Sequence, residues 1–323
     1  MLPPGSSTQS LGHSSRAPEG YLVFVKNISI ALFSATLLLS FPSCAAQEIP
    51  LDIHELDAPR AEMAAGELGA AWRSLRSIRT EELDRPTRVA YAQLAGEVAW
   101  QREDWDGALH HYNDFLHLRG PGAEIDIAAQ RMFQIATELL DGQHKTLGVF
   151  PQSHRGLITL ENLALWAPRH PLAPESLIRA GEYNFKKGDY ADAANNYRGV
   201  LAAYAGSEWT DLATYRIGMC SYHRLEGPWS DANLLTTAKS QFQQYLILFP
   251  EGRYAQQAED MSGTLYQLQA DRENMLGDYY ATLENDLGAR MYWTRAASFS
   301  GTPSAKAAQE KLRTLDATAT TAP

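Results

Sequence analysis

Residues 181–205 read GEYNFKKGDYADAANNYRGVLAAYA, and the spacing within this stretch indicates two helices joined by a tight turn. Gly181 is followed by Ala193, then by Tyr197, and finally by Ala205 at the expected end of the second helix. Small residues let two helices cross closely, and an aromatic side chain can fill the space beside them. The run Lys187-Gly-Asp-Tyr190 between them has the composition of a turn. The stretch therefore predicts a helical hairpin.

The same spacing recurs along the chain. Two further copies keep it unchanged: Gly96, Ala108, Tyr112 and Gly120, and then Gly277, Ala289, Trp293 and Gly301. A lengthened copy comprises Gly218, Ala238, Phe242 and Pro250, and a degenerate copy comprises Gly156, Leu160 and Pro168. Such hairpins bury their apolar faces only by stacking on their neighbours. We therefore predict an all-α fold, a tetratricopeptide-like helical-hairpin solenoid of about five helix pairs.

Residues 1–44 are predicted to be a leader rather than part of this fold. The segment Tyr21–Pro42 is mostly apolar, carries Lys26 near its start and ends in small residues, as a secretory signal does. Its apolar core is too short to cross a bilayer comfortably. The polar stretch before Tyr21 suggests that translation starts later than Met1.

Cys44 follows the apolar run directly and has the small residue Ser43 before it, which favours a lipoprotein signal with a lipid attached to the cysteine. Phe41 and Pro42 depart from the usual residues at the two positions before that. The alternative is ordinary cleavage after Ala45, which would give a soluble periplasmic protein. A lipidated chain with Ala45 after the cysteine is expected at the periplasmic face of the outer membrane.

The rest of the chain divides into four expected parts. Residues 45–57 are expected to be a tether, 58–122 N-terminal helical hairpins, 123–315 the main repeat region and 316–323 a disordered tail. The formal net charge of −10 argues against nucleic acid as a partner. Cys220 lies in an apolar helical stretch and is expected in the core.

Motifs that would carry chemistry are missing from the sequence. His110, His111 and His117 share one predicted helix, but no HExxH or CxxC motif accompanies them, so we interpret them as part of a solvated face. No phosphate-binding glycine motif occurs, and Glu81-Glu82 is typical of an exposed helix surface. We therefore predict a protein that is not an enzyme and has no cofactor or metal site.

A solenoid of hairpins offers a groove lined by the first helix of each pair. The residue four positions after the repeat glycine is aromatic in three copies: Trp100, Phe185 and Tyr222. With Lys186, Met219 and His223 beside them, these residues would suit an extended peptide or a partner helix. The alternative interpretation is that the aromatic residues only pack against the next hairpin.

Several runs resemble the BamD-type outer-membrane protein assembly lipoproteins. They are Ala173–Tyr183, Lys187–Tyr197, Ala238–Pro250 and Tyr254–Ala258, followed by Glu273–Tyr280 and Ala289–Arg295. The resemblance extends over about residues 125–312. The segments 146–155 and 225–237 are additional to the family's usual form.

The resemblance implies a non-enzymatic periplasmic scaffold, lipid-anchored to the outer membrane, that takes part in the assembly and insertion of β-barrel proteins. Its implied partners are a component of the barrel assembly machinery and unfolded barrel substrates. One alternative is a periplasmic repeat adaptor for envelope maintenance or division, which would usually show heptads before the repeats. Another is an enzyme with a helical toroid fold, for which a carboxylate-rich cavity would be expected.

Overall fold

The computed structural model describes residues 54–120, 122–142, 145–146 and 150–321. The predicted leader, Cys44 and most of the predicted tether lie outside the described residues. Residues 51–323 form one compact unit. Among the helices described, none combines the length and the apolar character needed to cross a membrane.

The described elements are almost all helices. In chain order they are the 3-10 helix η1 (His54–Leu56), α1 (Asp57–Ala64), α2 (Leu68–Ser77), α3 (Arg85–Gln101), α4 (Trp105–His117), α5 (Gly122–Leu140), β1 (Lys145–Thr146), β2 (Phe150–Pro151), α6 (Ser153–Trp166), α7 (Leu172–Lys187), α8 (Tyr190–Ala203), α9 (Thr210–His223), α10 (Ala232–Leu248), α11 (Ala255–Thr282), α12 (Asp286–Ala297) and α13 (Pro303–Thr321). The two short strands pair antiparallel within the segment that connects α5 and α6.

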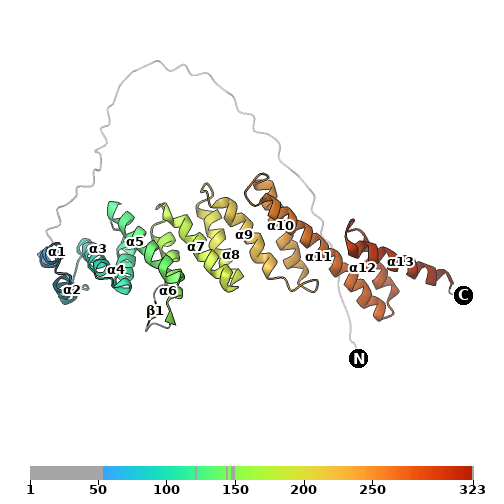
Figure 1. Ribbon diagram of the computed structural model, residues 1–323, viewed down its shortest axis with the longest axis horizontal. Coiled ribbons are helices and arrows are strands. Elements are labelled where there is room, and N and C mark those ends of the chain that lie inside the picture. The colour runs from blue at the N-terminus through green and yellow to red at the C-terminus, as the bar shows by residue number, and fades with distance from the viewer. Residues whose placement is uncertain (1–53, 121, 143–144, 147–149, 322–323) are drawn as a thin grey trace, which may run out of the picture. The chain divides into compact units, whose positions relative to one another are not determined.

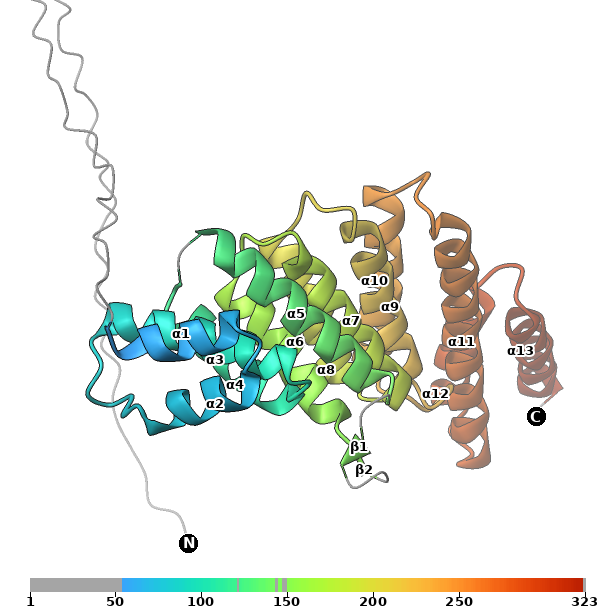
Figure 2. The same cartoon turned by 60° about the vertical axis from the view of Figure 1, so that its left-hand side comes forward.

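Consecutive helices pack as antiparallel hairpins, and each hairpin packs on the next (Figure 1). Five repeat hairpins are formed by α3 and α4, α5 and α6, α7 and α8, α9 and α10, and α11 and α12. The shorter pair α1 and α2 precedes them, and α13 packs on the last pair (Figure 2). The prediction of an all-α helical-hairpin solenoid is confirmed.

Helix ends follow from local sequence. Asp84 begins α3 by accepting a hydrogen bond from the Thr87 amide (2.9 Å), and Asp104 does the same for the Gly107 amide (3.0 Å) at the start of α4. Gly188 ends α7 with a φ of +86°, a conformation that glycine adopts without steric cost. The turn expected at 187–190 is therefore present.

Both ends of the array are more ordered than the sequence interpretation allowed. Leu56, assigned to the tether, is fully buried against Ala71 and Leu75 of α2. Residues 316–321, assigned to a disordered tail, continue α13, because no glycine or proline interrupts the chain between Leu315 and Thr321.

The repeat glycines lie where the helices of a hairpin cross. A Cβ atom built on Gly181 would lie 2.7 Å from the Tyr197 ring, and one on Gly277 would lie 2.3 Å from the Trp293 ring. In the same way, a Cβ atom built on Gly96 would lie 2.7 Å from the Tyr112 ring, and one on Gly218 would lie 2.9 Å from the Phe242 ring. The aromatic residue therefore occupies the space that any larger residue in place of the glycine would need.

The degenerate copy has a different register from the one expected. Gly156 lies on the second helix of its hairpin, and a Cβ atom there would lie 2.6 Å from the backbone oxygen of Ala136 on the first helix. Ala136 thus takes the position of the repeat glycine, Gly156 that of the alanine and Leu160 that of the aromatic residue. In the first, third and fifth hairpins the second small residue comes twelve positions after the first, whereas in the second and fourth it comes twenty positions after.

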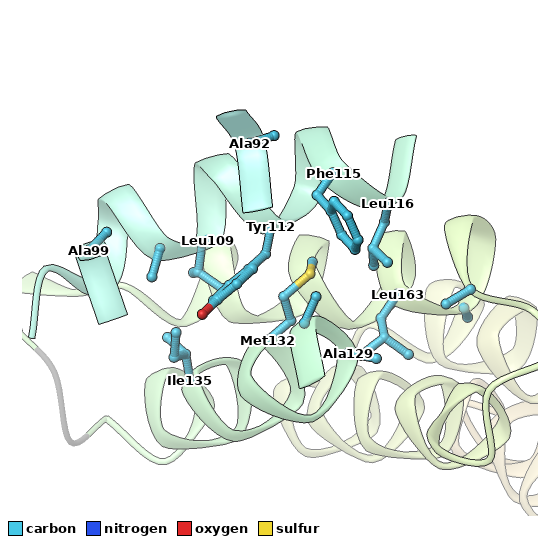
Figure 3. Packing of buried hydrophobic residues seen from close by; sticks show 14 of the residues in the cluster. Ala92, Ala99, Leu109, Tyr112, Phe115, Leu116, Ala129, Met132, Ile135 and Leu163 are labelled. Atoms are coloured by element: carbon cyan, nitrogen blue, oxygen red, sulfur yellow. The ribbon is translucent and has the colours of Figure 1, made fainter. Parts of the chain in front are cut away.

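The buried core runs between hairpins as well as within them. Tyr112, Phe115 and Leu116 of α4 pack with Met132 of α5 and Leu163 of α6 (Figure 3). This cluster joins the first two repeat hairpins, so that neither hairpin can bury its apolar face alone.

We expect Gly277→Ala to destabilise the protein, because the added methyl would overlap the buried Trp293 ring. Overpacking of this kind costs about 1–3 kcal/mol. Gly263 is a matched control on the same helix, since it is exposed and a Cβ atom there meets nothing within 4 Å. Gly263→Ala should raise the thermal midpoint slightly through helix propensity. Equal changes in the thermal midpoint of the two variants, measured by circular dichroism, would contradict the close crossing of α11 and α12 at Gly277.

Candidate partner-binding surface

A set of three polar side chains joins each odd-numbered hairpin to the helix that follows it. In the first hairpin the Tyr112 hydroxyl donates to Glu97 (2.8 Å), and Arg131 of α5 forms an ion pair with the same carboxylate. Arg131 also donates to the Tyr112 hydroxyl (2.5 Å). We call such a set of an acid, an aromatic donor and a cation from the following helix a polar triad.

The third hairpin repeats this arrangement. Tyr197 donates to Glu182 (2.8 Å), and Arg216 of α9 donates to both oxygens of that carboxylate at 2.6 and 2.8 Å. Burial raises the pKa of Tyr197, as it does for Tyr112, so both hydroxyls keep the proton that they donate. A bidentate contact of this kind fixes the orientation of the two side chains as well as the distance between them.

The fifth hairpin forms the triad with different residue types. The Trp293 indole nitrogen donates to Asp278 (3.0 Å), and Lys311 of α13 donates to both oxygens of Asp278 at 2.5 and 2.7 Å. The helix that follows the last hairpin therefore docks through the same chemistry as the helices inside the array.

The second and fourth hairpins have no acid at this position. Thr137 follows Ala136, which is buried with Leu160, and Met219 follows Gly218 and packs in the same cluster as Phe242. Neither Leu160 nor Phe242 can donate a hydrogen bond. Hairpins with a triad and hairpins without one therefore alternate along the array.

Two of the three predicted groove aromatics lie under the cations of the triads. Arg131 is placed over the Trp100 ring at 5.1 Å, and Arg216 over the Phe185 ring at 4.9 Å. Trp105 and Tyr190 contact the same two rings edge to face at 5.3 Å. Trp100 and Phe185 are half-buried and take part in the stacking of the hairpins, and their role in partner binding stays a prediction.

Three of the other predicted residues, Lys186, Tyr222 and His223, line two hollows between the first helices of neighbouring hairpins. The first hollow, of about 470 Å³, lies between α5, α7 and α9, and Lys186 lines it with Arg179 and Trp209. We call it the α7 hollow. The second, of about 490 Å³, lies between α9 and α11, and Tyr222 and His223 line it with Asp271. We call it the α9 hollow.

Sequence reasoning missed several residues of these hollows. Leu225 and Gly227 of the additional segment line the α9 hollow, so the insertion itself was the available signal. Trp209 precedes α9 and was not singled out, because its position is set by packing between hairpins rather than by the repeat spacing. Met219, like Tyr222, packs against the buried cluster around Phe242, but it lines neither hollow.

Cys220 is buried, as expected, with 1% of its surface exposed. Burial raises the pKa of its thiol to about 12, so it stays protonated and unreactive near neutral pH.

The stacked hairpins, their close crossings and the hollows between first helices define a helical-hairpin repeat protein of the tetratricopeptide type. Residues 155–297, from α6 to α12, match the family described as YfiO, outer membrane lipoprotein. The resemblance to the BamD-type lipoproteins is thereby confirmed for these residues, which are fewer than the 125–312 expected.

Three solved structures that match the chain are distant from it in sequence. The MamA protein is 14% identical over 61% of this chain and 91% of that chain, with a TM-score of 0.29. PilW, a widely conserved type IV pilus biogenesis factor, is 15% identical over 81% and 96%, with a TM-score of 0.28. A tetratricopeptide repeat protein from Parabacteroides merdae is 14% identical over 81% and 97%, with a TM-score of 0.28. No curated protein matches the chain.

We expect Arg216→Met to lower stability by about 1–3 kcal/mol, because it leaves the half-buried Glu182 carboxylate without its charged donor. Arg179→Met is the control, since Arg179 is half-exposed and pairs with Glu175 on its own helix, where an ion pair contributes little.

The triple change Glu182→Met, Tyr197→Phe, Arg216→Met converts this triad into an apolar contact like that of Met219 and Phe242. It should recover much of the loss, because no buried charge is left unpaired. Thermal unfolding of all three variants is the measurement. A single variant as stable as the control would show that the triad does not hold the hairpins together.

Proposed function

We propose that this protein is a non-enzymatic periplasmic scaffold that is lipid-anchored to the outer membrane through Cys44. In this role it takes part in the assembly and insertion of outer-membrane β-barrel proteins through protein–protein contacts. The observation that carries the proposal is the match of residues 155–297 to an outer membrane lipoprotein family. The same segment contains α7 and α9, whose side chains line both hollows.

The composition of the two hollows supports binding of a polypeptide. The α7 hollow combines apolar surface from Ile178 and Leu212 with charged groups of both signs: the cations Arg179, Lys186 and Lys187 and the acids Asp141 and Glu182. The α9 hollow offers Tyr222 and Leu268 beside polar groups. Apolar pockets with a few polar groups at their edges suit an extended segment or a helix with alternating contacts. A component of the barrel assembly machinery and unfolded barrel substrates are the proposed partners.

We expect Lys186→Glu and Tyr222→Ala to weaken partner capture without unfolding the protein. Lys186 is exposed, and Tyr222 is half-buried and lines the α9 hollow, with no arginine or lysine placed over its ring among the described residues. Loss of an aromatic anchor from an interface often costs about 2 kcal/mol or more of binding.

The measurement is the amount of barrel assembly component that co-purifies with the membrane-extracted protein. Lys306→Glu is the matched charge reversal, because Lys306 is exposed on α13 and lies outside the family match. Undiminished capture by both site variants would place the binding surface elsewhere on the protein.

The proposed anchor has its own test. Cys44→Ser should move the mature protein from the membrane pellet to the soluble fraction while leaving its circular dichroism unchanged, because a lipid on Cys44 would be the main membrane attachment. Metabolic labelling with a fatty acid should mark the wild type and not the variant. Pelleting of the variant at the wild-type level would contradict lipid anchoring through this residue.

A further inference from the structure

Three side chains with metal-binding chemistry meet on α4, away from both hollows. One possible ligand atom from each of His110, His111 and Asp114 lies within 4.8 Å of the other two. His110 Nε2 and Asp114 Oδ2 are 3.5 Å apart, one helical turn from each other. The group lines a separate hollow of about 360 Å³, together with Tyr91 and Arg88.

His111 departs from the solvated face predicted for the histidines. It is half-buried, with the edges of Trp72 and Tyr91 packed at ring distances of 5.7 and 5.9 Å. Among the described residues it has no hydrogen-bond partner for its ring nitrogens. A ring nitrogen of a neutral imidazole carries a lone pair that can bind a metal ion.

Arg88 and His117 also line this hollow, but both side chains contact other groups. Arg88 donates to the Leu83 carbonyl (3.1 Å), which holds its guanidinium on the chain before α3. His117 lies one turn beyond Asp114 and packs edge-on against Trp166 at 4.4 Å. The carboxylate of Asp114 is the negative charge that would balance a bound cation.

We propose that His110, His111 and Asp114 form a binding site for Zn²⁺, with water completing the coordination. Two imidazoles and one carboxylate are a ligand set that suits zinc rather than calcium or magnesium. Zinc bonds of about 2.0–2.1 Å in a tetrahedron separate neighbouring ligand atoms by about 3.3 Å. The pair of His110 and Asp114 already has this separation, and His110 is exposed, so its ring can turn toward His111.

This inference is independent of the proposed function and is tested on the untagged full chain by calorimetric titration with zinc chloride and by thermal unfolding. The wild type should bind one zinc ion and unfold at a higher temperature when zinc is present. His110→Gln with Asp114→Asn should weaken binding by more than about tenfold, since even groups that only support metal ligands contribute about 10–100-fold. The double variant should also lose the zinc-dependent rise in unfolding temperature.

Two further variants make the outcome decisive. His111→Phe keeps an aromatic ring between Trp72 and Tyr91 and should also abolish tight binding. His154→Gln, an exposed histidine of α6, should bind zinc as the wild type does. The inference is overturned if the wild type takes up no zinc, or if the double variant, folded by circular dichroism, binds it as tightly as the wild type.

Discussion

Four of the five repeat hairpins depend on one contact, the fit of an aromatic ring against the bare backbone of a glycine on the other helix. Tyr112 on Gly96 and Tyr197 on Gly181 are two instances, and the second hairpin achieves the same approach with Gly156 against the backbone of Ala136. Glycine inside a helix costs about 0.5–1 kcal/mol relative to alanine. The close packing of a fully buried aromatic ring offsets that cost, so the helix axes approach closely wherever the glycine stands.

The polar triads add direction to this packing. An apolar contact tolerates some sliding of one helix on another, whereas hydrogen bonds among three side chains from three helices are satisfied in only one arrangement. Triads are present in the first, third and fifth hairpins and are replaced by apolar contacts in the second and fourth. The second and fourth hairpins, which have the longer spacing, are therefore flanked by hairpins that are held to the following helix by charged hydrogen bonds. This arrangement favours a single order of stacking.

Much of this architecture was predictable from the sequence, because the small and aromatic residues of a hairpin are close along the chain. The site was less predictable, since its contacts join residues about one repeat apart. Glu182 and Arg216 are 34 residues apart, and no local pattern shows that Arg216 would cover Phe185. The register of Gly156 was misassigned because the glycine of this hairpin lies on the second helix, whereas in the other hairpins it lies on the first. His111 was placed in solvent because its cover comes from α2 and α3.

The long helix α11 has a mechanical consequence. Its first half packs with α10 around Leu265, its last turns cross α12 at Gly277, and it also contacts α13. At 28 residues it is about 42 Å long, and it runs without a break through both sets of contacts. A displacement of the terminal hairpin would therefore be carried through one continuous helix to Thr264 and Leu268, which line the α9 hollow.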